Sequence, residues 1–263
     1  MRIAGSTVLL TGVTGGIGRT LASELARKGA KLVLTGRRAD ALEAVAAEFG
    51  ARTVVADLAE PAQVERLAEE CADADILIAN AALPSSGDLL DYTPEQVDRA
   101  LTVNLRAPVM LARLLAPTMV GAGRGHIAFV GSISGKAATR SSSLYNATKF
   151  GLRGFALGLR QDLHGTGVGV SVVQPGFVRD AGMFAATGAT PPGGMRTVSP
   201  QQVAAGVIRA IERDLCEVNV APLEMRVLSA IAGQFPGFAE KVQRRSGAEP
   251  TIRQIVDAQQ DTR

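Results

Sequence analysis

Residues 7–18 read TVLLTGVTGGIG, a short apolar run followed directly by a glycine-rich turn. The run predicts a buried strand, and the turn stands where a helix would begin. Gly12 permits a tight turn, Gly16 lets the backbone approach a pyrophosphate, and Gly18 lets helix and strand pack closely. The spacing is G-x-x-x-G-x-G, and a tight turn without a ligand is the alternative. The expected dinucleotide contacts in this turn are Gly12, Thr14, Gly16, Ile17 and Gly18.

The rest of the chain alternates short apolar runs with longer helical patterns. This order is typical of successive βαβ units, whose strands form a parallel sheet covered by helices on both faces. We therefore predict an α/β fold with one doubly wound (Rossmann) parallel sheet of about seven strands. The expected strands are residues 7–11, 31–35, 52–56, 75–78, 126–131, 168–173 and 217–220.

Length and composition predict a single domain over residues 1–263. The chain is 46% hydrophobic and 20% charged, which excludes a disordered protein. Its net charge of +3 is spread out, which argues against nucleic-acid binding. Cys71 and Cys216 are too far apart in sequence to indicate a disulfide framework or a metal site. The start lacks a signal-peptide pattern and no apolar run is long enough to span a bilayer, so we expect a cytoplasmic protein.

Two helix starts are marked by a hydroxyl residue, a proline and a glutamine at residues 93–96 and 199–202. Apolar residues then recur every four positions, which predicts that both helices pack on the sheet. These residues are Val97, Leu101 and Leu105 in the first helix and Val203, Val207 and Ile211 in the second. The long irregular stretch at 180–198 is rich in Gly, Pro and Ala and predicts an active-site lid.

The residues after the second expected strand indicate the choice of cofactor. NAD-selective units often carry a carboxylate here, but residues 35–38 read TGRR. The guanidinium groups of Arg37 and Arg38 could instead bind a 2′-phosphate, which favours NADP(H) over NAD(H). Two solvated surface arginines are the alternative.

Tyr145 is followed four residues later by Lys149, a spacing that places both side chains on one face of a helix. A nearby ammonium favours the phenolate, and so predicts a lowered pKa for Tyr145. Such a tyrosine could exchange a proton with a carbonyl or alcohol oxygen while hydride moves to or from a nicotinamide. Ser132, at the end of the expected strand 126–131, could hydrogen-bond the same oxygen.

Together these residues resemble the short-chain dehydrogenase/reductase (SDR) family over roughly residues 5–220. The similarity rests on several motifs in the family's order. They are the turn at 11–18, Asp57-Leu58, Asn80-Ala81-Ala82, Asn104, Ser132, Tyr145 with Lys149, and Pro175-Gly176.

The resemblance implies a role for each matched residue. Tyr145 would be the general acid/base, Lys149 would bind the nicotinamide ribose and lower the pKa of the tyrosine, and Ser132 would orient the substrate oxygen. Asn104 would hold a water for proton relay, and Arg37 would favour NADP(H). The further implied cofactor contacts are Asp57, Leu58, Asn80, Tyr145, Lys149, Pro175 and Gly176.

The chain departs from the family pattern at two places. Ala82 replaces the glycine that usually ends the Asn-Ala-Gly triplet. Asp180 stands where the family often has a threonine that contacts the nicotinamide amide. An ionised carboxylate cannot donate a hydrogen bond to that amide. We therefore expect the backbone of Val178 to make this contact, and the effect of Asp180 on lid closure is open.

The apolar residues of the expected lid are Met183, Phe184 and Met195, and they favour a hydrophobic carbonyl or alcohol that is lipid-, steroid- or acyl-like. Met183 and Phe184 are the predicted substrate contacts, although these side chains could instead anchor the loop. Residues 222–263 form an amphipathic extension that could lie on a membrane surface, roof the pocket or pack in a dimer. The family resemblance implies a homodimer or homotetramer, formed partly by the helices beginning at Pro94 and near Ser143.

The leading hypothesis is an NADP(H)-dependent oxidoreductase that interconverts a ketone or aldehyde and an alcohol on a small hydrophobic substrate. The alternatives are a binding module that senses NAD(P)(H) without turnover, and an NAD-dependent alcohol dehydrogenase of the same family. No metal is expected, because His126 and His164 lack carboxylate or cysteine partners at metal-ligand spacing.

Overall fold

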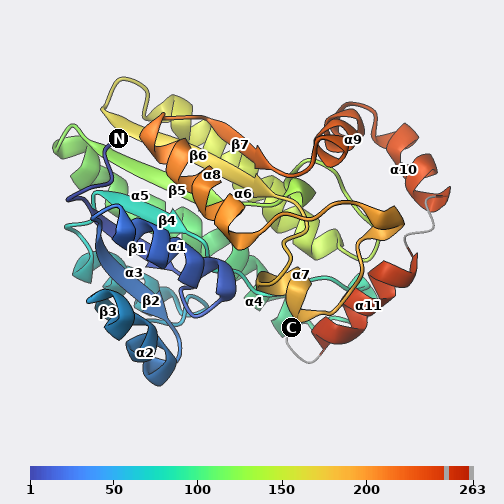
Figure 1. Ribbon diagram of the computed structural model, residues 1–263, viewed down its shortest axis with the longest axis horizontal. Coiled ribbons are helices and arrows are strands. Elements are labelled where there is room, and N and C mark those ends of the chain that lie inside the picture. Colours follow the sequence, from blue (N-terminus) through green and yellow to red (C-terminus); the bar gives the residue numbers. More distant parts are fainter. Residues whose placement is uncertain (246–248, 261–263) are drawn as a thin grey trace.

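Seven parallel strands form the centre of the protein in a computed structural model, which describes residues 1–245 and 249–260 (Figure 1). The strands are β1 (Thr7–Thr11), β2 (Lys31–Gly36), β3 (Arg52–Val55), β4 (Ile76–Ala79), β5 (Gly125–Val130), β6 (Val168–Pro175) and β7 (Glu217–Val220). Their order across the sheet is β3-β2-β1-β4-β5-β6-β7. The predicted α/β fold is confirmed, and the expected strand boundaries agree with the observed ones to within two residues.

Helices cover both faces of this sheet, as a doubly wound fold requires. One face is covered by α1 (Gly16–Arg27), α2 (Ala39–Phe49) and α8 (Pro200–Glu212), whose apolar residues join one buried cluster. The other face is covered by α3 (Pro61–Glu70), α5 (Ala107–Gly121) and α6 (Ser143–Asp162), whose apolar residues join a second cluster. The strands are buried between these two cores, which explains their nearly continuous apolar sequences.

The side of the sheet on which the chain adds strands changes between β1 and β4, although all strands are parallel. From β1 the chain moves to β2 and β3 on one side, and from β4 it moves to β5, β6 and β7 on the other. In such sheets ligands bind outside the carboxyl ends of the strands at this point. The predicted cofactor and catalytic residues at Gly12, Asn80, Ser132 and Pro175 stand at the ends of β1, β4, β5 and β6. The fold therefore brings them to one edge.

The two predicted helix starts have complete capping boxes. In α4 (Pro94–Leu101) the Gln96 N–H donates to Thr93 Oγ1 at 3.3 Å, and the Thr93 N–H donates to Gln96 Oε1 at 3.0 Å. The start of α8 is built in the same way from Ser199 and Gln202. These bonds satisfy N–H groups that the first helical turn leaves without intrahelical partners.

The two predicted apolar faces differ in what they cover. In α8, Val203, Val207 and Ile211 are fully buried against the sheet. The expected face of the first helix is only partly buried: Val97 and Leu101 lie in α4, which packs against α6, and Leu105 lies in a π-helical segment, η2 (Thr102–Arg106), that follows α4 directly. Leu105 packs against the buried cluster on one face of the sheet, and the main contact with the strands is made by α5, which continues the same helical run beyond η2.

The expected lid and C-terminal extension contain more regular structure than their sequences suggest. Residues 180–198 include a short helix, α7 (Gly182–Ala186), and a 3₁₀ turn, η4 (Pro192–Gly194). The extension forms α9 (Leu223–Gln234), α10 (Pro236–Arg245) and α11 (Glu249–Gln259), and its residues 246–248 and 261–263 lie outside the described part. Figure 1 shows α9 and α10 standing out from the sheet, while α11 turns back beside α7.

Hydrogen bonds tie α11 to the loops around the carboxyl edge of the sheet. Thr251 Oγ1 donates to the carbonyl of Thr190 at 2.9 Å, and the Thr190 N–H donates to Gln254 Oε1 at 3.3 Å. The Ser86 N–H donates to Gln259 Oε1 at 3.2 Å. The first half of α11 is thus bonded to residue 190 of segment 180–198, and its end is bonded to the loop after β4.

Candidate active site

The glycine turn after β1 is held by the end of β4. Gly12 adopts a φ of +71°, and a Cβ there would lie 2.7 Å from the Cα of Ala81. Asn80 Nδ2 donates to the carbonyls of Thr11 at 3.0 Å and Gly12 at 3.2 Å. A Cβ on Gly18 would lie 2.3 Å from the Gly12 carbonyl oxygen, which requires a glycine. Asn80 therefore shapes the turn, and its direct contact with the cofactor stays a prediction.

The start of α1 faces the lid. A Cβ on Gly16 would lie 2.5 Å from the Cβ of Ala181, and a Cβ on Gly182 would lie 3.0 Å from Ile17 Cδ1. Within the described residues no side chain caps this helix, which leaves its first N–H groups available to an anion. In this structure Gly16 allows a close approach by Ala181 of segment 180–198, so this segment lies beside the start of α1, where the phosphates are expected.

The end of β2, where Arg37 follows, lies close to Thr14 of the glycine turn. Arg37 is exposed and follows Gly36 directly, and Thr14 Cγ2 would lie 3.4 Å from a Cβ on Gly36. The backbone at Arg37 therefore lies near the glycine turn, and its side chain is open to solvent. Beyond β3, Leu58 is buried, and Asp57 Oδ1 accepts a hydrogen bond from the Ala59 N–H at 2.9 Å.

Ser132, Tyr145 and Lys149 come together beside the end of β5. A side-chain hydrogen bond joins Ser132 and Tyr145, and Lys149 Nζ lies 5.7 Å from the centroid of the tyrosine ring. The Ser134 N–H donates to Ser132 Oγ at 3.1 Å, so the serine oxygen accepts there while its hydroxyl proton can be donated to another oxygen. Lys149 is buried, and its Nζ donates to the Val130 carbonyl at 3.3 Å.

Burial controls the protonation of this group. It raises the pKa of the Tyr145 phenol, an effect that the hydrogen bond with Ser132 opposes. Burial also lowers the pKa of Lys149 to about 8. The lowered phenol pKa predicted from the Tyr–Lys spacing is therefore not found, because the loss of hydration outweighs the hydrogen bond with Ser132. At neutral pH the tyrosine is held in the protonated form that can donate to a carbonyl.

Asn104 lies in the π-helical segment η2 and is fully buried. Its Oδ1 accepts from the Leu83 N–H at 2.6 Å, and its Nδ2 donates to the Leu83 carbonyl at 3.0 Å and to Ser85 Oγ at 3.4 Å. The side chain thus fixes the loop after β4. π-Helical turns occur frequently at functional sites, but the amide of Asn104 is engaged with this loop and the water relay stays a prediction.

The chain after β6 leads from the sheet into the lid. The Gly176 N–H donates to the Val220 carbonyl at 2.9 Å, and a Cβ on Gly176 would lie 2.7 Å from Met225 Sδ in α9. Val178 pairs with Val198 through the Val198 N–H to Phe177 carbonyl bond and the Arg179 N–H to Val198 carbonyl bond, both 2.9 Å. These bonds use the peptide groups on either side of Val178, so its own N–H and C=O point the other way.

Asp180 replaces the family's threonine without entering the site. It has a φ of +65°, its side chain is 71% exposed, and its carboxylate lies 3.3 Å from Arg179 Nε. An aspartate tolerates this left-handed backbone better than most residues. Asp180 therefore belongs to the turn that starts the lid.

The large apolar side chains of segment 180–198 are packed to different degrees. Phe184 packs on Phe177 with 4.6 Å between the ring centroids, and Met183 and Met195 are partly buried. Phe184 thus anchors the lid in this structure, one of the two roles left open for it. Phe177 belongs to no sequence motif, and the sequence alone did not indicate that it contacts Phe184.

Gln174 is a second contact that no motif marks. It is fully buried in β6, and its Oε1 accepts from the Ser132 N–H at 2.8 Å. A signal was available, because a glutamine within an apolar strand must find hydrogen-bond partners.

The residues present fit a nicotinamide dinucleotide. The glycine turn has no room for side chains at Gly12 and Gly18, and the start of α1 offers N–H groups to phosphates. Lys149 is a buried ammonium with three donors, and the Val130 carbonyl accepts from one of them. Ribose hydroxyls would suit the other two.

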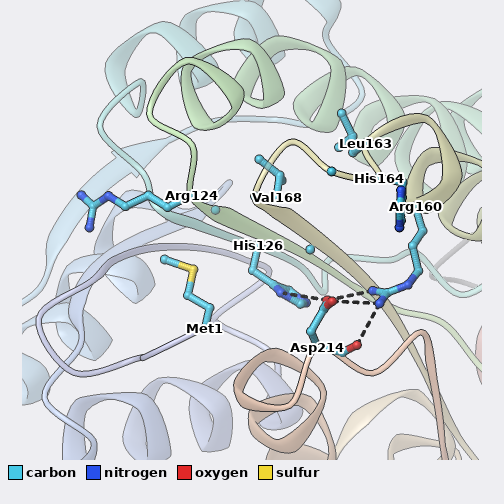
Figure 2. A pocket seen from close by; sticks show the side chains of 12 residues that line it. Met1, Arg124, His126, Arg160, Leu163, His164, Val168 and Asp214 are labelled. Carbon is cyan, nitrogen blue, oxygen red and sulfur yellow. Dashed lines mark hydrogen bonds and ion pairs between the residues drawn. The ribbon is translucent and has the colours of Figure 1, made fainter.

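A separate pocket of about 460 Å³ lies at the opposite edge of the sheet, where β5 and β6 begin (Figure 2). His126 is buried there, and its Nε2 lies 2.9 Å from Ser171 Oγ. Burial lowers its pKa to about 4, so the ring is neutral. Arg160 pairs with Asp214 through two bonds of 2.8 Å. No group of three possible metal ligands occurs among the described residues.

Two further features bear on the sequence predictions. Cys71 is buried and Cys216 is exposed, and neither forms a disulfide. Across residues 1–245 and 249–260, no helix has both the length and the apolar character needed to cross a membrane.

The sequence matches the family model described as short chain dehydrogenase over residues 6–191. Ketoacyl reductase HetN of Nostoc sp. is 35% identical over 227 residues, which cover 83% of this chain and 79% of the relative. A short-chain dehydrogenase from Sphingobium yanoikuyae, solved in complex with NADPH, superposes with a TM-score of 0.76 at 31% sequence identity. The matched part covers 89% of this chain and 95% of the Sphingobium chain. The bulky-bulky ketone specific alcohol dehydrogenase from Comamonas testosteroni has a TM-score of 0.74 at 25% identity, over 93% of this chain and 98% of its own.

Proposed function

Because the chain belongs to the short-chain dehydrogenase family, an oxidoreductase family, we propose that it interconverts a ketone or aldehyde and an alcohol with NADP(H), using Tyr145 as general acid/base. The observation that carries this proposal is the hydrogen-bonded pair of Ser132 and Tyr145, with Lys149 buried beside it at the carboxyl edge of the sheet.

In the reductive direction, Tyr145 donates its phenolic proton to the carbonyl oxygen of the substrate as hydride adds to the carbonyl carbon. Ser132 donates a hydrogen bond to the same oxygen and stabilises its developing charge. Lys149 holds the ribose hydroxyls and, as an ammonium, stabilises the tyrosinate left after proton transfer. The cofactor, when bound, supplies the hydride in reduction and accepts it in oxidation. The raised pKa keeps Tyr145 protonated at neutral pH, so the phenol carries the proton at the start of the reductive direction.

The cofactor would lie along the carboxyl edge of the sheet. Its phosphates would meet the glycine turn and the start of α1, with Thr14 and Ile17 at its sides. Asp57 and Leu58 would meet adenine, Pro175 and Gly176 would line the nicotinamide end, and the Val178 backbone would bind its amide. We propose NADP(H) because Arg37 is exposed at the end of β2, with no carboxylate in residues 35–38. The NADPH-bound S. yanoikuyae relative supports this choice.

We propose a hydrophobic substrate. Met183 and Met195 are partly buried in the lid, and Phe184 is held on Phe177 at the same place. The hydrogen bonds from α11 to Thr190 and Ser86 enclose this side of the site further. The Comamonas relative, named for bulky ketones, supports a roomy apolar pocket.

We propose that α9 and α10 contact an anionic phospholipid surface. They carry seven large apolar side chains that are each at least 40% exposed: Leu223, Val227, Leu228, Ile231, Phe235, Phe238 and Val242. Arg226 and Lys241 are exposed on the same helices, whereas the carboxylates of Glu224 and Glu240 are paired with arginines. Apolar side chains flanked by free cations favour a bilayer with negative headgroups.

Vesicle sedimentation tests this contact. Phosphatidylcholine vesicles containing phosphatidylglycerol should pull down the wild-type protein, and the double change Phe235→Ser/Phe238→Ser should abolish this. Failure of the wild type to bind contradicts the contact. A solution mass that falls in the double variant would assign the surface to a second copy instead.

We also propose that the protein is a homodimer or homotetramer in solution. The half-buried apolar face of α4 and Phe150 of α6, which is 41% exposed, would lie in its interface. Light scattering should give the mass of two or four chains.

A panel of carbonyl compounds tests the proposed reaction. We expect the protein to oxidise NADPH in the presence of long-chain or polycyclic ketones, with the corresponding alcohols as products. NADPH binding without turnover across the panel would favour the sensor alternative, and faster turnover with NADH would favour an NAD-dependent dehydrogenase.

A further inference from the structure

A buried glutamine lies directly behind Ser132. The Ser132 backbone is extended, with a φ of −165°, and its N–H donates to Gln174 Oε1 at 2.8 Å. Gln174 stands at the end of β6 and has no exposed surface. The bond therefore ties the serine on the β5 side to the neighbouring strand, at the point where both strands enter the site.

The other end of the glutamine is fixed by a carboxylate. Gln174 Nε2 donates to Glu217 Oε1 at 3.2 Å. An ionised carboxylate can only accept hydrogen bonds, so it determines which end of the amide faces it. The carbonyl of Gln174 must then point at the Ser132 N–H, which is the orientation that Ser132 requires.

Glu217 is in turn held by two cations from different elements. Arg153 of α6 donates to its two oxygens at 2.8 and 3.2 Å, and Lys136 donates to Oε2 at 3.1 Å. Burial alone would raise the pKa of the Glu217 carboxyl, but hydrogen bonds from Arg153, Gln174 and Lys136 hold it below its ordinary value. At working pH the carboxylate is therefore charged and can only accept hydrogen bonds.

Two glycines make room for the glutamine. A Cβ on Gly131 would lie 2.5 Å from Gln174 Oε1, and a Cβ on Gly135 would lie 3.5 Å from the same atom and 2.7 Å from the Lys149 carbonyl oxygen. The backbone on both sides of Ser132 thus closes tightly around the amide. Small displacements of Gln174 would move this backbone.

We propose that Gln174 is a positioning residue for Ser132 and that Glu217 sets the orientation of its amide. This inference rests on the proposed function, in which Ser132 donates to the substrate oxygen. Because a misplacement of about 1 Å can reduce a rate roughly 100-fold, loss of the Gln174 bond should lower kcat. Substrate KM should change much less.

Exchange of the two side chains gives a sharp test. In Gln174→Glu two carboxylates would face each other, and we expect kcat to fall about 10- to 100-fold. The double variant Gln174→Glu/Glu217→Gln restores one amide and one carboxylate, and should recover most of that loss. Gln201→Glu, an exposed change of the same type in α8, is the matched control and should behave as wild type.

The pH dependence separates positioning from a general structural defect. In Gln174→Glu the introduced carboxyl group is buried beside Glu217 and would have a raised pKa. Below that pKa the group is neutral and can donate to Glu217 while its carbonyl accepts from Ser132. The activity of Gln174→Glu relative to wild type should therefore rise as pH falls, with NADPH affinity and unfolding midpoint measured alongside.

The outcomes distinguish this inference from the proposed function. If the wild type turns over substrate and Gln174→Glu lowers kcat by twofold or less, the positioning role is overturned and the proposed function is left intact. A loss that neither lower pH nor the double variant relieves also overturns it. Absence of wild-type turnover on the carbonyl panel overturns both.

Discussion

Replacement of the buried lysine by methionine, Lys149→Met, should make the protein more stable while it removes activity. Lys149 is 3% exposed, and burial lowers its pKa from 10.5 to about 8. A methionine of similar length fills the same space without a charge. Residues that serve a site at the expense of stability are expected to respond in this way.

The magnitude follows from the two pKa values. One pKa unit corresponds to 1.36 kcal/mol, so the buried ammonium destabilises the fold by about 3 kcal/mol at pH 7. The lost hydrogen bond to the Val130 carbonyl, 3.3 Å long, offsets about 1 kcal/mol. We expect Lys149→Met to gain about 2 kcal/mol in free energy of unfolding.

The sign of the pH dependence is fixed by the direction of the shift. Between about pH 8 and 10.5 the unfolded lysine binds a proton that the folded one does not, so wild-type stability rises with pH. The advantage of the methionine variant should therefore shrink by about 2 kcal/mol from pH 7 to 9.5.

Urea unfolding of the cofactor-free protein at the two pH values measures this difference. Lys31→Met, at an exposed position on β2, is the control and should change stability by less than about 0.5 kcal/mol at either pH. A methionine variant that is no more stable than wild type at pH 7, or an advantage independent of pH, would refute the reasoning.

Two further predictions concern the cofactor. Arg37→Asp should lower the ratio of kcat/KM for NADPH over NADH by about 100-fold or more, because a guanidinium–phosphate contact becomes a repulsion. The control Arg27→Asp, on the exposed surface of α1, should leave this ratio unchanged. An unchanged ratio in Arg37→Asp would mean that the Arg37 side chain points away from the ribose. NADPH should slow trypsin cleavage after Arg179 and Arg196, since Ala181 packs over Gly16 where the phosphates are expected; equal cleavage rates with and without NADPH would count against a lid.

The parts of the fold that sequence predicted well depend on local signals. The strands were recognisable because both faces are covered, and the helix starts at Pro94 and Pro200 because their caps are encoded within four residues. The glycine turn is partly of this kind, since a side chain at Gly18 would meet the Gly12 carbonyl oxygen within the turn, whereas one at Gly12 would meet Ala81 after β4. Such signals need no knowledge of distant contacts.

The missed features depend on partners that are remote in sequence. The apolar face of α4 was assigned to the sheet, but α4 packs mainly on α6, and the sheet contact is made farther along the chain by α5. Asn104 is occupied by Leu83 and Ser85, and Gln174 by Ser132 and Glu217. No spacing rule connects these positions.

The pKa of Tyr145 shows the same limit. Its spacing from Lys149 correctly indicated proximity, but the direction of the shift depends on burial, which only the packed structure provides. The helices after residue 222 likewise follow an amphipathic pattern, while the contact of α11 with Thr190 and Ser86 could not be read from it.

The most direct test of the central claim compares Tyr145→Phe with wild type in two assays on the same preparations. We predict that the phenylalanine variant binds NADPH with wild-type affinity but reduces a substrate ketone at least about 100-fold more slowly, because it lacks the proton that the carbonyl oxygen must receive. Reduction at an unchanged rate would contradict the assignment of Tyr145 as the general acid.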